Sequence, residues 1–485
     1  MTTTTPTAPV AVTSRRAWAA LAVLLAGMFM SLLDTTIVNV ALPSIEGSLD
    51  ANEATLSWII SGYALAFGLV LIPAGRFGDR FGHKWVFFTG LAIFTLASLA
   101  CGLAEDSVQL IVARVVQGIG GGIFFPPVTA FIQLMFPPMK RGKAFGIMGA
   151  VIGISSALGP VVGGLLIEAL GAEDGWRWIF TVNLPIGILA LIAAAFLLPK
   201  GSEGKRLSTD GVGLVLLSAS LVAILVPLIQ GQDEGWPLWT YLSLAAGVIL
   251  LVIFAFWERR LAARGVEPLV PPHLFSHAAF TGGTILALVY FAAFTSIFFT
   301  ISILWQSGLG HTALESGLVS IPFAIGSIIG ASQSDRLAGK LGRTVLVLGV
   351  AMVTVGLGAA WLVLLLVPAA DLTNWDLLGP LLVAGIGSGF FIAPNARFIV
   401  ATVDRSEAGA ASGVIGTMQR IGSAVGIAVI GSVLFGNISA ANIQGPADVG
   451  PAFVSAATIA MGVSVCFSIV AFLLVFTLPK KVTLH

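Results

Sequence analysis

The sequence is poor in charged residues. Only 10% of its 485 residues are Asp, Glu, Lys or Arg, while 57% are hydrophobic and the mean hydropathy is +1.00. Soluble globular domains carry about 25% charged residues, and a water-soluble chain of this length could not bury so much apolar surface. The scarcity of charge therefore excludes a soluble enzyme, a disordered chain and a nucleic-acid-binding protein.

Cysteine and histidine are also scarce. The two cysteines, Cys101 and Cys466, lie in or beside apolar runs, and the five histidines fall in predicted loops or in the C-terminal tail. Such numbers exclude a disulfide framework and provide no cluster that suggests a metal site. No nucleotide-binding loop of the form Gly-x-x-x-x-Gly-Lys-Ser/Thr occurs. We therefore expect no cofactor, no metal and no ATP-driven chemistry.

Long apolar runs are abundant instead. A membrane helix needs about 20 consecutive mostly apolar residues, and fourteen such runs predict an all-α membrane protein. They are 17–40, 55–75, 84–103, 108–134, 143–169, 177–198, 211–230, 239–257, 279–303, 315–333, 343–367, 376–400, 407–436 and 455–477. Residues 1–14 are rich in Thr and Pro and are predicted to be a disordered tail.

The distribution of charge supports this count. Of the 24 Lys and Arg residues, all except Arg114, Arg177 and Arg420 fall on the side of the N-terminus when the spans are followed in order. Most acids, such as Glu46 and Asp106, fall on the opposite side. Because Lys and Arg collect in cytoplasmic loops, both termini are predicted to be cytoplasmic.

Parts of the chain repeat. Gly118–Pro127 matches Gly385–Pro394 at most positions, and Phe81-Gly82-His83 corresponds to Leu341-Gly342-Arg343 at nearly the same offset. Gly339 stands where the first half has Asp79, so no symmetric charge contact is expected in the second half. The repeat predicts two six-helix halves around a central site, as in many transporters. The predicted divisions are 15–200, an inserted helix pair at 201–265, 266–478, and a tail at 479–485.

Three charges lie deep within predicted spans: Asp34, Arg114 and Arg420. A charge at the bilayer centre costs about 2.5–3.5 kcal/mol on insertion scales, so such residues are usually functional. Asp34 and Arg114 lie about six residues from the same side, roughly 9–10 Å deep at 1.5 Å per residue, so they can pair. This arrangement suits a carboxylate that loads and releases a proton, although a structural ion pair is the alternative. Arg420 can contact a polar or anionic substrate or tie helices together.

Several motifs resemble a known family. Gly75–Lys84 (Gly-Arg-Phe-Gly-Asp-Arg-Phe-Gly-His-Lys) resembles the signature between the second and third helices of the major facilitator superfamily. Leu33–Pro43 resembles the first-helix motif of its fourteen-helix drug–proton antiporter branch. Arg114–Gly118 resembles the fourth-helix motif, Gly153–Gly164 the fifth-helix antiporter motif, and Trp176–Phe180 a stretch typical of this branch.

The resemblance implies a major facilitator fold and proton-driven export of lipophilic drugs, antibiotics or natural products. It implies a multi-pass monomer in the bacterial cytoplasmic membrane, with protons, lipid and a small lipophilic or amphiphilic substrate as partners, and no nucleic acid. Proton coupling is assigned to Asp34 and Arg114. A lipid or glycolipid flippase, an amphiphilic-metabolite transporter and a membrane receptor without transport are the alternatives.

The residue types in two of these motifs also suggest what the motifs do physically. In the gating segment (residues 75–84), glycines permit a tight turn and close helix approach, and the acid can accept hydrogen bonds from a helix N-terminus or an arginine. Its candidate residues are Gly75, Asp79, Arg80, Gly82 and Lys84. In the antiporter motif, small residues allow close packing and a proline can bend the helix. Its candidate residues are Gly153, Gly159, Pro160, Gly163 and Gly164. An ordinary basic loop and plain helix packing are the respective alternatives.

Aromatic, amide and basic side chains are candidates for a substrate cavity, because apolar pockets with few polar groups suit lipophilic ligands. Each of them singly can also be a packing residue or an interfacial anchor. The candidates are Asn39, Trp58, Tyr63, Gln117, Tyr290, Phe294, Gln306, Asn395, Gln419 and Arg420.

Overall fold

The structure is a computed structural model. It describes residues 14–51, 53–171, 174–199, 210–231, 234–401, 403–404, 407–441 and 445–479. Most of the two predicted tails and the start of the predicted insert lie outside the described residues.

The described chain is helical and contains fourteen segments that are long and apolar enough to cross a membrane. The predicted all-α fold class and span count are therefore confirmed. The helices before the insert are α1 (Ser14–Leu49), α2 (Glu53–Phe81), α3 (His83–Gly102), α4 (Ser107–Met135), α5 (Pro138–Leu170), α6 (Gly175–Thr181) and α7 (Asn183–Leu197). The insert consists of α8 (Gly211–Gln230) and α9 (Leu238–Ala263).

The remaining helices form the second half. They are η1 (Pro272–Ser276), α10 (Ala278–Ile303), the π-helical η2 (Leu304–Gly308), α11 (Ala313–Val319), α12 (Ile321–Leu341), α13 (Thr344–Leu366), α14 (Leu378–Val400), α15 (Ala408–Ala440) and α16 (Pro446–Val475).

Two spans that the sequence predicts as continuous helices are broken. The span at 177–198 divides into α6 and α7, and the span at 315–333 divides into α11 and α12. Pro185 and Pro322 lie just after the breaks. Proline has no N–H and its ring clashes with the carbonyl four residues earlier, so each helix restarts close to its proline.

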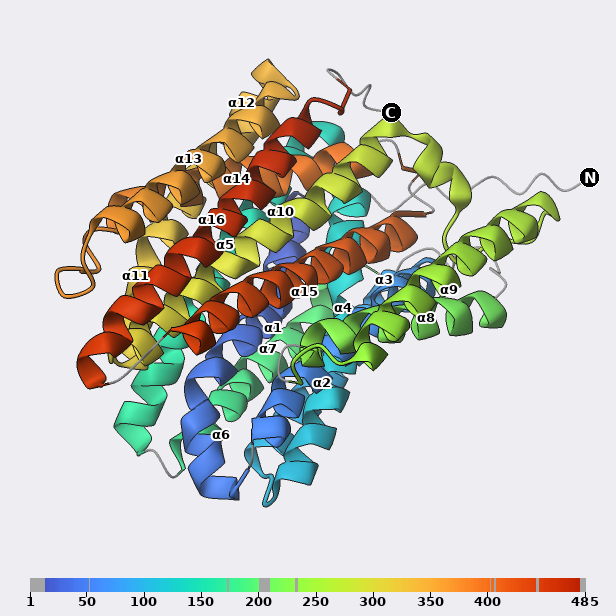
Figure 1. Ribbon diagram of the computed structural model, residues 1–485. Helices are drawn as coiled ribbons and strands as arrows, with labels where there is room; N and C mark the ends of the chain where they lie inside the picture. Colours follow the sequence, from blue (N-terminus) through green and yellow to red (C-terminus); the bar gives the residue numbers. More distant parts are fainter. Residues whose placement is uncertain are drawn as a thin grey trace, which may run out of the picture.

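The helices pack into two similar groups (Figure 1). In the first half α2 and α3 pack on α4, and α1 packs on α5; in the second half α12 and α13 pack on α14, and α10 packs on α15. The halves meet where α2 packs on α15 and where α5 packs on α12, while the inserted α8 contacts both α2 and α15. The insert therefore lies against a boundary between the halves.

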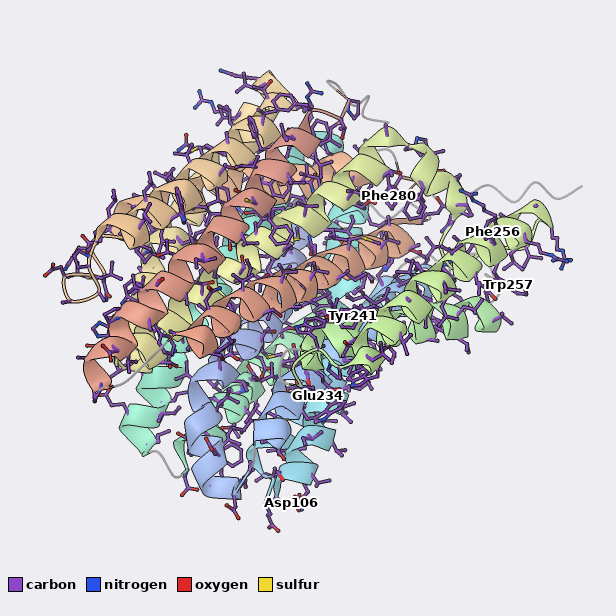
Figure 2. All side chains as sticks on the ribbon, viewed as in Figure 1. Asp106, Glu234, Tyr241, Phe256, Trp257 and Phe280 are labelled. Atoms are coloured by element: carbon purple, nitrogen blue, oxygen red, sulfur yellow. The ribbon has the colours of Figure 1, made fainter. Side chains whose placement is uncertain are left out.

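The two ends of the bundle differ in charge. We call the end that carries Arg76, Lys84 and Arg141 the basic end, and the end that carries Glu46 and Asp106 the acidic end. In Figure 2, Asp106 marks the acidic end of the first half. Side chains made largely of carbon cover the outward faces of the helices. Many large apolar side chains of the insert point outward, including Leu242 and Phe256, which are 62% and 65% exposed. Such faces suit contact with lipid.

Candidate functional site

The centre of the first half holds a fully buried carboxylate, Asp34 on α1. Its Oδ2 pairs with Nη1 of Arg114 on α4 at 2.5 Å, and the two side chains are 0% and 1% exposed. Its Oδ1 accepts hydrogen bonds from Gln117 Nε2 at 2.9 Å and from Asn183 Nδ2 at 3.0 Å. Gln117 Nε2 also donates to Ser98 Oγ on α3, at 2.8 Å. Three helices, α3, α4 and α7, thus supply the side chains around one buried acid on α1.

Arg114 is held by further contacts. Its Nε donates to the carbonyl oxygen of Ile59 at 3.1 Å, and its Nη1 also donates to Gln117 Oε1 at 2.7 Å. The guanidinium carbon lies 4.2 Å from the centre of the Tyr63 ring and 5.6 Å from that of Phe180. Hydrogen bonds and cation–π contacts therefore fix the guanidinium on both sides.

Two residues of this cluster, Asn183 and Ser98, are not among the site residues predicted from the sequence. Asn183 is the first residue of α7, directly after the break at Val182. An amide beside a proline within an apolar span was the available signal, because a broken membrane helix often places polar groups at a binding site. No sequence signal singles out Ser98 from the other small residues of α3.

A row of aromatic and cationic groups runs from this cluster to the second half. Tyr63 on α2 contacts Phe67, whose ring centre lies 5.9 Å away, and Arg420 on α15 lies 4.1 Å above the Phe67 ring. Within the described part of the chain Arg420 forms no ion pair. The electron-rich face of an aromatic ring is therefore its neighbour instead of an acid.

The gating segment contacts the second half at the basic end. Asp79 Oδ1 and Oδ2 accept hydrogen bonds from the backbone N–H groups of Gly409 and Ala410, both at 2.9 Å, at the N-terminus of α15. Its side chain is 1% exposed and also lies 3.4 Å from His83 Nε2. A helix N-terminus favours a negative charge. A side-chain carbon on Gly75 would collide with the Gly409 carbonyl group, so α2 and α15 touch through their backbones.

The other residues of the gating segment make contacts within the first half. Lys84 Nζ donates to the carbonyl oxygens of Ala195 and Leu198, at 2.6 and 3.0 Å, at the end of α7. Gly82 has a φ of +91° at the turn between α2 and α3, which glycine adopts without a steric penalty. Arg80 lies 4.9 Å over the ring of the next residue.

An acid also lies at the matching boundary on the other side of the bundle. Asp335 on α12 pairs with Arg397 on α14 at 2.9 Å. A side-chain carbon on Gly142 of α5 would collide with both groups, so this ion pair presses against the first half. The second half therefore does carry a charged contact at this boundary, four residues before Gly339 and with an arginine as partner.

Two further polar contacts join the halves near the basic end. Thr129 Oγ1 on α4 and Ser412 Oγ on α15 form a short hydrogen bond. Gln133 Nε2 donates to the carbonyl oxygen of Val400 at 3.1 Å. Together with Asp79 they close the basic end in the conformation described.

The antiporter motif on α5 lies between α1 and the second half. Side-chain carbons on Gly159 and Gly163 would collide with Thr36 and Ile37 of α1, and one on Gly153 would collide with Ser327 of α12. The glycines thus permit close contact on two faces of α5, as small residues do in membrane bundles.

The rest of the motif contacts α11, the helix that begins the span predicted at 315–333. Gly164 lies against Leu314 of α11, and the ring of Pro160 lies against Gly317. α5 remains one continuous helix through Pro160. This contact joins the halves on the acidic side.

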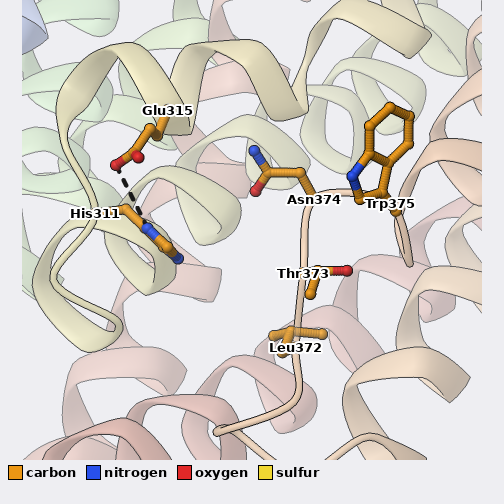
Figure 3. Close-up of a pocket in the computed structure, with 6 residues that line it drawn as sticks. All are labelled: His311, Glu315, Leu372, Thr373, Asn374 and Trp375. Atoms are coloured by element: carbon orange, nitrogen blue, oxygen red, sulfur yellow. Dashed lines mark ion pairs between the residues drawn. The ribbon is translucent and has the colours of Figure 1, made fainter.

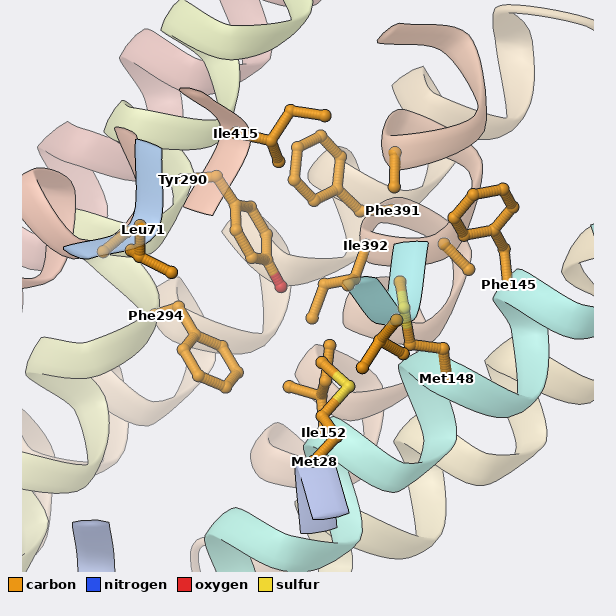
Figure 4. Close-up of a cluster of buried hydrophobic side chains, with 14 of the residues drawn as sticks. Met28, Leu71, Phe145, Met148, Ile152, Tyr290, Phe294, Phe391, Ile392 and Ile415 are labelled. Carbon is orange, nitrogen blue, oxygen red and sulfur yellow. The ribbon is translucent and has the colours of Figure 1, made fainter. Parts of the chain in front are cut away.

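Apolar side chains from both halves meet in the middle of the protein (Figure 4). The ring of Tyr290 on α10 lies 4.1 Å from that of Phe391 and 6.0 Å from that of Phe294, measured between centres. First-half side chains such as Met148 and Leu71 complete the cluster.

The remaining candidates for the substrate cavity do not form one group. Asn395 is 3% exposed and its Nδ2 donates to the carbonyl oxygen of Gly283. Gln306 Nε2 donates to Ser302 Oγ, and Gln419 is half-buried beside Arg420. Asn39 and Trp58 lie toward the acidic side. Both side chains are exposed, and the exposed fraction of Trp58 is 38%.

A hollow of about 280 Å³ lies at the acidic end of the second half (Figure 3). The ion pair between His311 Nδ1 and Glu315 Oε2, at 3.4 Å, forms one wall, and Asn374 and Trp375 form the other. Within the described residues, no group of three or more His, Cys, Asp or Glu side chains could hold a metal ion.

Comparison with known proteins decides the family. The model of the Major Facilitator Superfamily matches residues 24–427. The chain belongs to the major facilitator superfamily. This membership makes it a transporter and not an enzyme, and it confirms the resemblance seen in the motifs.

Individual facilitators show how far the similarity extends. The chain is 36% identical over 422 residues to the probable actinorhodin transporter of Streptomyces coelicolor, which covers 86% of this chain and 72% of that protein. It is 34% identical over 422 residues to the puromycin resistance protein of Streptomyces alboniger, covering 86% and 82%. The solved structure of the proton:xylose symporter XylE matches with a TM-score of 0.65 over 95% of both chains at 14% identity, which shows a shared fold.

Proposed function

We propose that this facilitator exports lipophilic antibiotics or related drugs across the bacterial cytoplasmic membrane in exchange for protons. The observation that carries the proposal is the buried Asp34 carboxylate, held by Arg114, Gln117 and Asn183 within a single six-helix half. The similarity to transporters named for actinorhodin and for puromycin resistance supports drugs or antibiotics as the substrate class.

The geometry explains why proton binding changes the conformation. As a carboxylate, Asp34 neutralises Arg114 and accepts every hydrogen bond that its neighbours direct at it. When Asp34 takes up a proton, the buried guanidinium loses its counter-charge. Leaving one partner of a buried ion pair alone costs about 3–5 kcal/mol. Proton uptake therefore destabilises the arrangement of α1, α4 and α7 described here and favours the other state of the transport cycle.

The closed basic end assigns a role to the gating segment within this cycle. Residues 15–200 and 266–478 form the two rocking halves, with residues 201–265 as the insert, and the basic end faces the cytoplasm. Asp79 bonds the halves together at that end, and the Asp335–Arg397 pair of the second half packs against Gly142 of the first. Opening toward the cytoplasm requires that the Asp79 hydrogen bonds break and that Gly142 separate from the ion pair.

The substrate path lies between the halves. Arg420, Gln419 and the aromatic residues Tyr290 and Phe294 border the boundary between them. An apolar boundary with few polar groups suits a lipophilic compound.

The test uses purified protein in liposomes with an imposed pH gradient. Wild type is expected to accumulate puromycin or a second lipophilic antibiotic against its gradient. Asp34→Asn is expected to retain downhill flux and to lose accumulation, because an amide cannot carry the proton. Asp371→Asn, which removes an exposed acid at the acidic end, is the control and should behave as wild type. Accumulation by Asp34→Asn that equals wild type would refute proton coupling through this residue.

A further inference from the structure

The insert carries two acids whose carboxyl groups meet near the basic end. Asp210 directly precedes α8 and is 9% exposed, and Glu258 lies near the end of α9 and is 2% exposed. A side-chain carbon on Gly213 would collide with both Asp210 Oδ2 and Glu258 Oε1. The two carboxylate oxygens therefore flank the same face of Gly213.

The donors around this pair leave one oxygen without a partner. Asp210 Oδ1 accepts from the Gly213 N–H and its Oδ2 accepts from Trp257 Nε1, both at 2.9 Å; Figure 2 labels Trp257 on α9. Glu258 Oε2 accepts from the Val270 N–H at 2.8 Å. Glu258 Oε1, on the side of Asp210, is buried and has no hydrogen-bond partner. Buried polar atoms in proteins are normally hydrogen-bonded, so a donor is needed between the two acids.

A proton meets this need better than a metal ion does. A protonated carboxyl group donates to a neighbouring carboxylate, and two acids that share a site keep one proton between them. The other neighbours of the pair are N–H donors, which repel a cation, and Ca²⁺ or Mg²⁺ needs about six oxygen ligands. Arg76 of α2 also faces Glu258 and offsets the negative charge that remains.

The pair is linked to the gating segment by the connector, residues 264–271. Glu258 holds the connector at Val270, and Arg76 Nη2 donates to the carbonyl oxygen of Pro268 at 2.7 Å. Arg76 belongs to the gating segment, next to Gly75, which touches α15. Glu267 of the connector also has a buried Oε2 without a hydrogen-bond partner.

We propose that Glu258 and Asp210 form a second proton-binding site, distinct from Asp34, that fastens the connector to the insert and to the gating segment. The bound proton joins the two carboxyl groups. When it dissociates, the two adjacent carboxylates repel each other; the Glu258 side chain turns away from Asp210 and leaves the Val270 N–H, so the connector separates from α9. The site therefore responds to pH at the basic end.

The test measures how readily the connector separates. Val270→Cys, in a Cys101→Ala/Cys466→Ala background, places a thiol at a side chain that is 5% exposed, and maleimide labelling reports its opening. If opening releases one proton, the labelling rate is expected to rise about tenfold per pH unit once the pair begins to ionise. Val266→Cys, at a connector position that is 41% exposed, corrects for the pH dependence of the thiol reaction itself.

Glu258→Gln separates the proton from mere packing. Its amide can donate to Asp210 while its oxygen still accepts from the Val270 N–H, so labelling should stay slow at every pH. Glu258→Ala should label quickly at every pH. Infrared difference spectra of the purified protein should also show a carbonyl band of a protonated carboxyl group that Glu258→Gln loses and Asp34→Asn retains. The proposal is overturned if the corrected labelling rate is independent of pH in the wild-type pair, or if Glu258→Gln labels as fast as Glu258→Ala.

Discussion

The guanidinium of Arg420 lies 4.1 Å above the ring of Phe67 and so joins α15 of the second half to α2 of the first. Phe67 in turn contacts Tyr63, on which Arg114 lies. The buried ion pair and the boundary between the halves are therefore connected by direct contacts. Only two aromatic side chains, Tyr63 and Phe67, lie between the Asp34–Arg114 pair and Arg420 of the second half.

Replacing Phe67 tests this contact. Phe67→Leu should destabilise the protein by about 0.5–2 kcal/mol, the range for a cation–π contact, because a half-buried guanidinium loses the ring beneath it. Phe67→Tyr keeps the ring and should lose less stability than Phe67→Leu, although its hydroxyl enters a buried site. The midpoint of thermal unfolding in detergent gives the comparison. Equal losses in both variants would show that side-chain shape and not the ring face stabilises Arg420.

A disulfide across the basic end should stop transport. Thr129 and Ser412 lie in hydrogen-bond contact on opposite halves, so Thr129→Cys/Ser412→Cys in the cysteine-free background should crosslink on oxidation. Crosslinking holds the basic end closed, and substrate flux should fall to the level of empty liposomes. Reduction should restore it, while either single cysteine should transport under both conditions. Flux that persists in the fully crosslinked protein would show that the basic end need not open.

Gly75 tests whether the backbone contact between α2 and α15 is needed. Gly75→Ala puts a methyl group into the Gly409 carbonyl group and should destabilise the closed basic end by about 1–3 kcal/mol, as overpacking does. Transport should fall, and the crosslinking rate of the Thr129/Ser412 cysteine pair should fall with it. Gly47→Ala is the matched control, because nothing lies within 4 Å of the added carbon. A normal crosslinking rate in Gly75→Ala would contradict this interpretation.

The orientation in the membrane can be measured directly. Met139 at the basic end is 90% exposed and Trp375 at the acidic end is 78% exposed. In intact cells, an impermeant maleimide should label Trp375→Cys and leave Met139→Cys unlabelled until the membrane is opened. The reverse pattern would place the basic end outside and would invert the direction of transport that we propose.

The sequence alone predicts those features that depend only on counting residues along each helix. Span number follows from length and hydropathy, and the pairing of Asp34 with Arg114 could be anticipated because equal depth depends only on counting along two helices. The contacts from α3 and α7 could not be anticipated, since the rotation of each helix about its axis decides whether Ser98 faces Gln117 and whether Asn183 faces Asp34. The contact of Arg420 with Phe67 could not be anticipated either, because Phe67 comes from the opposite half. The break before α7 could have been predicted from Pro185.

The contacts at the two ends of helix α7 have a mechanical consequence. Asn183 at its first turn holds Asp34, while Lys84 and Arg16 donate to carbonyl oxygens at its last turn. Fifteen residues at 1.5 Å each make a rigid connection of about 22 Å. A shift of α7 along its axis therefore moves both of its ends together. A shift at Asp34 would also move the carbonyl groups that accept from Lys84, so α7 links the buried acid mechanically to the start of α3.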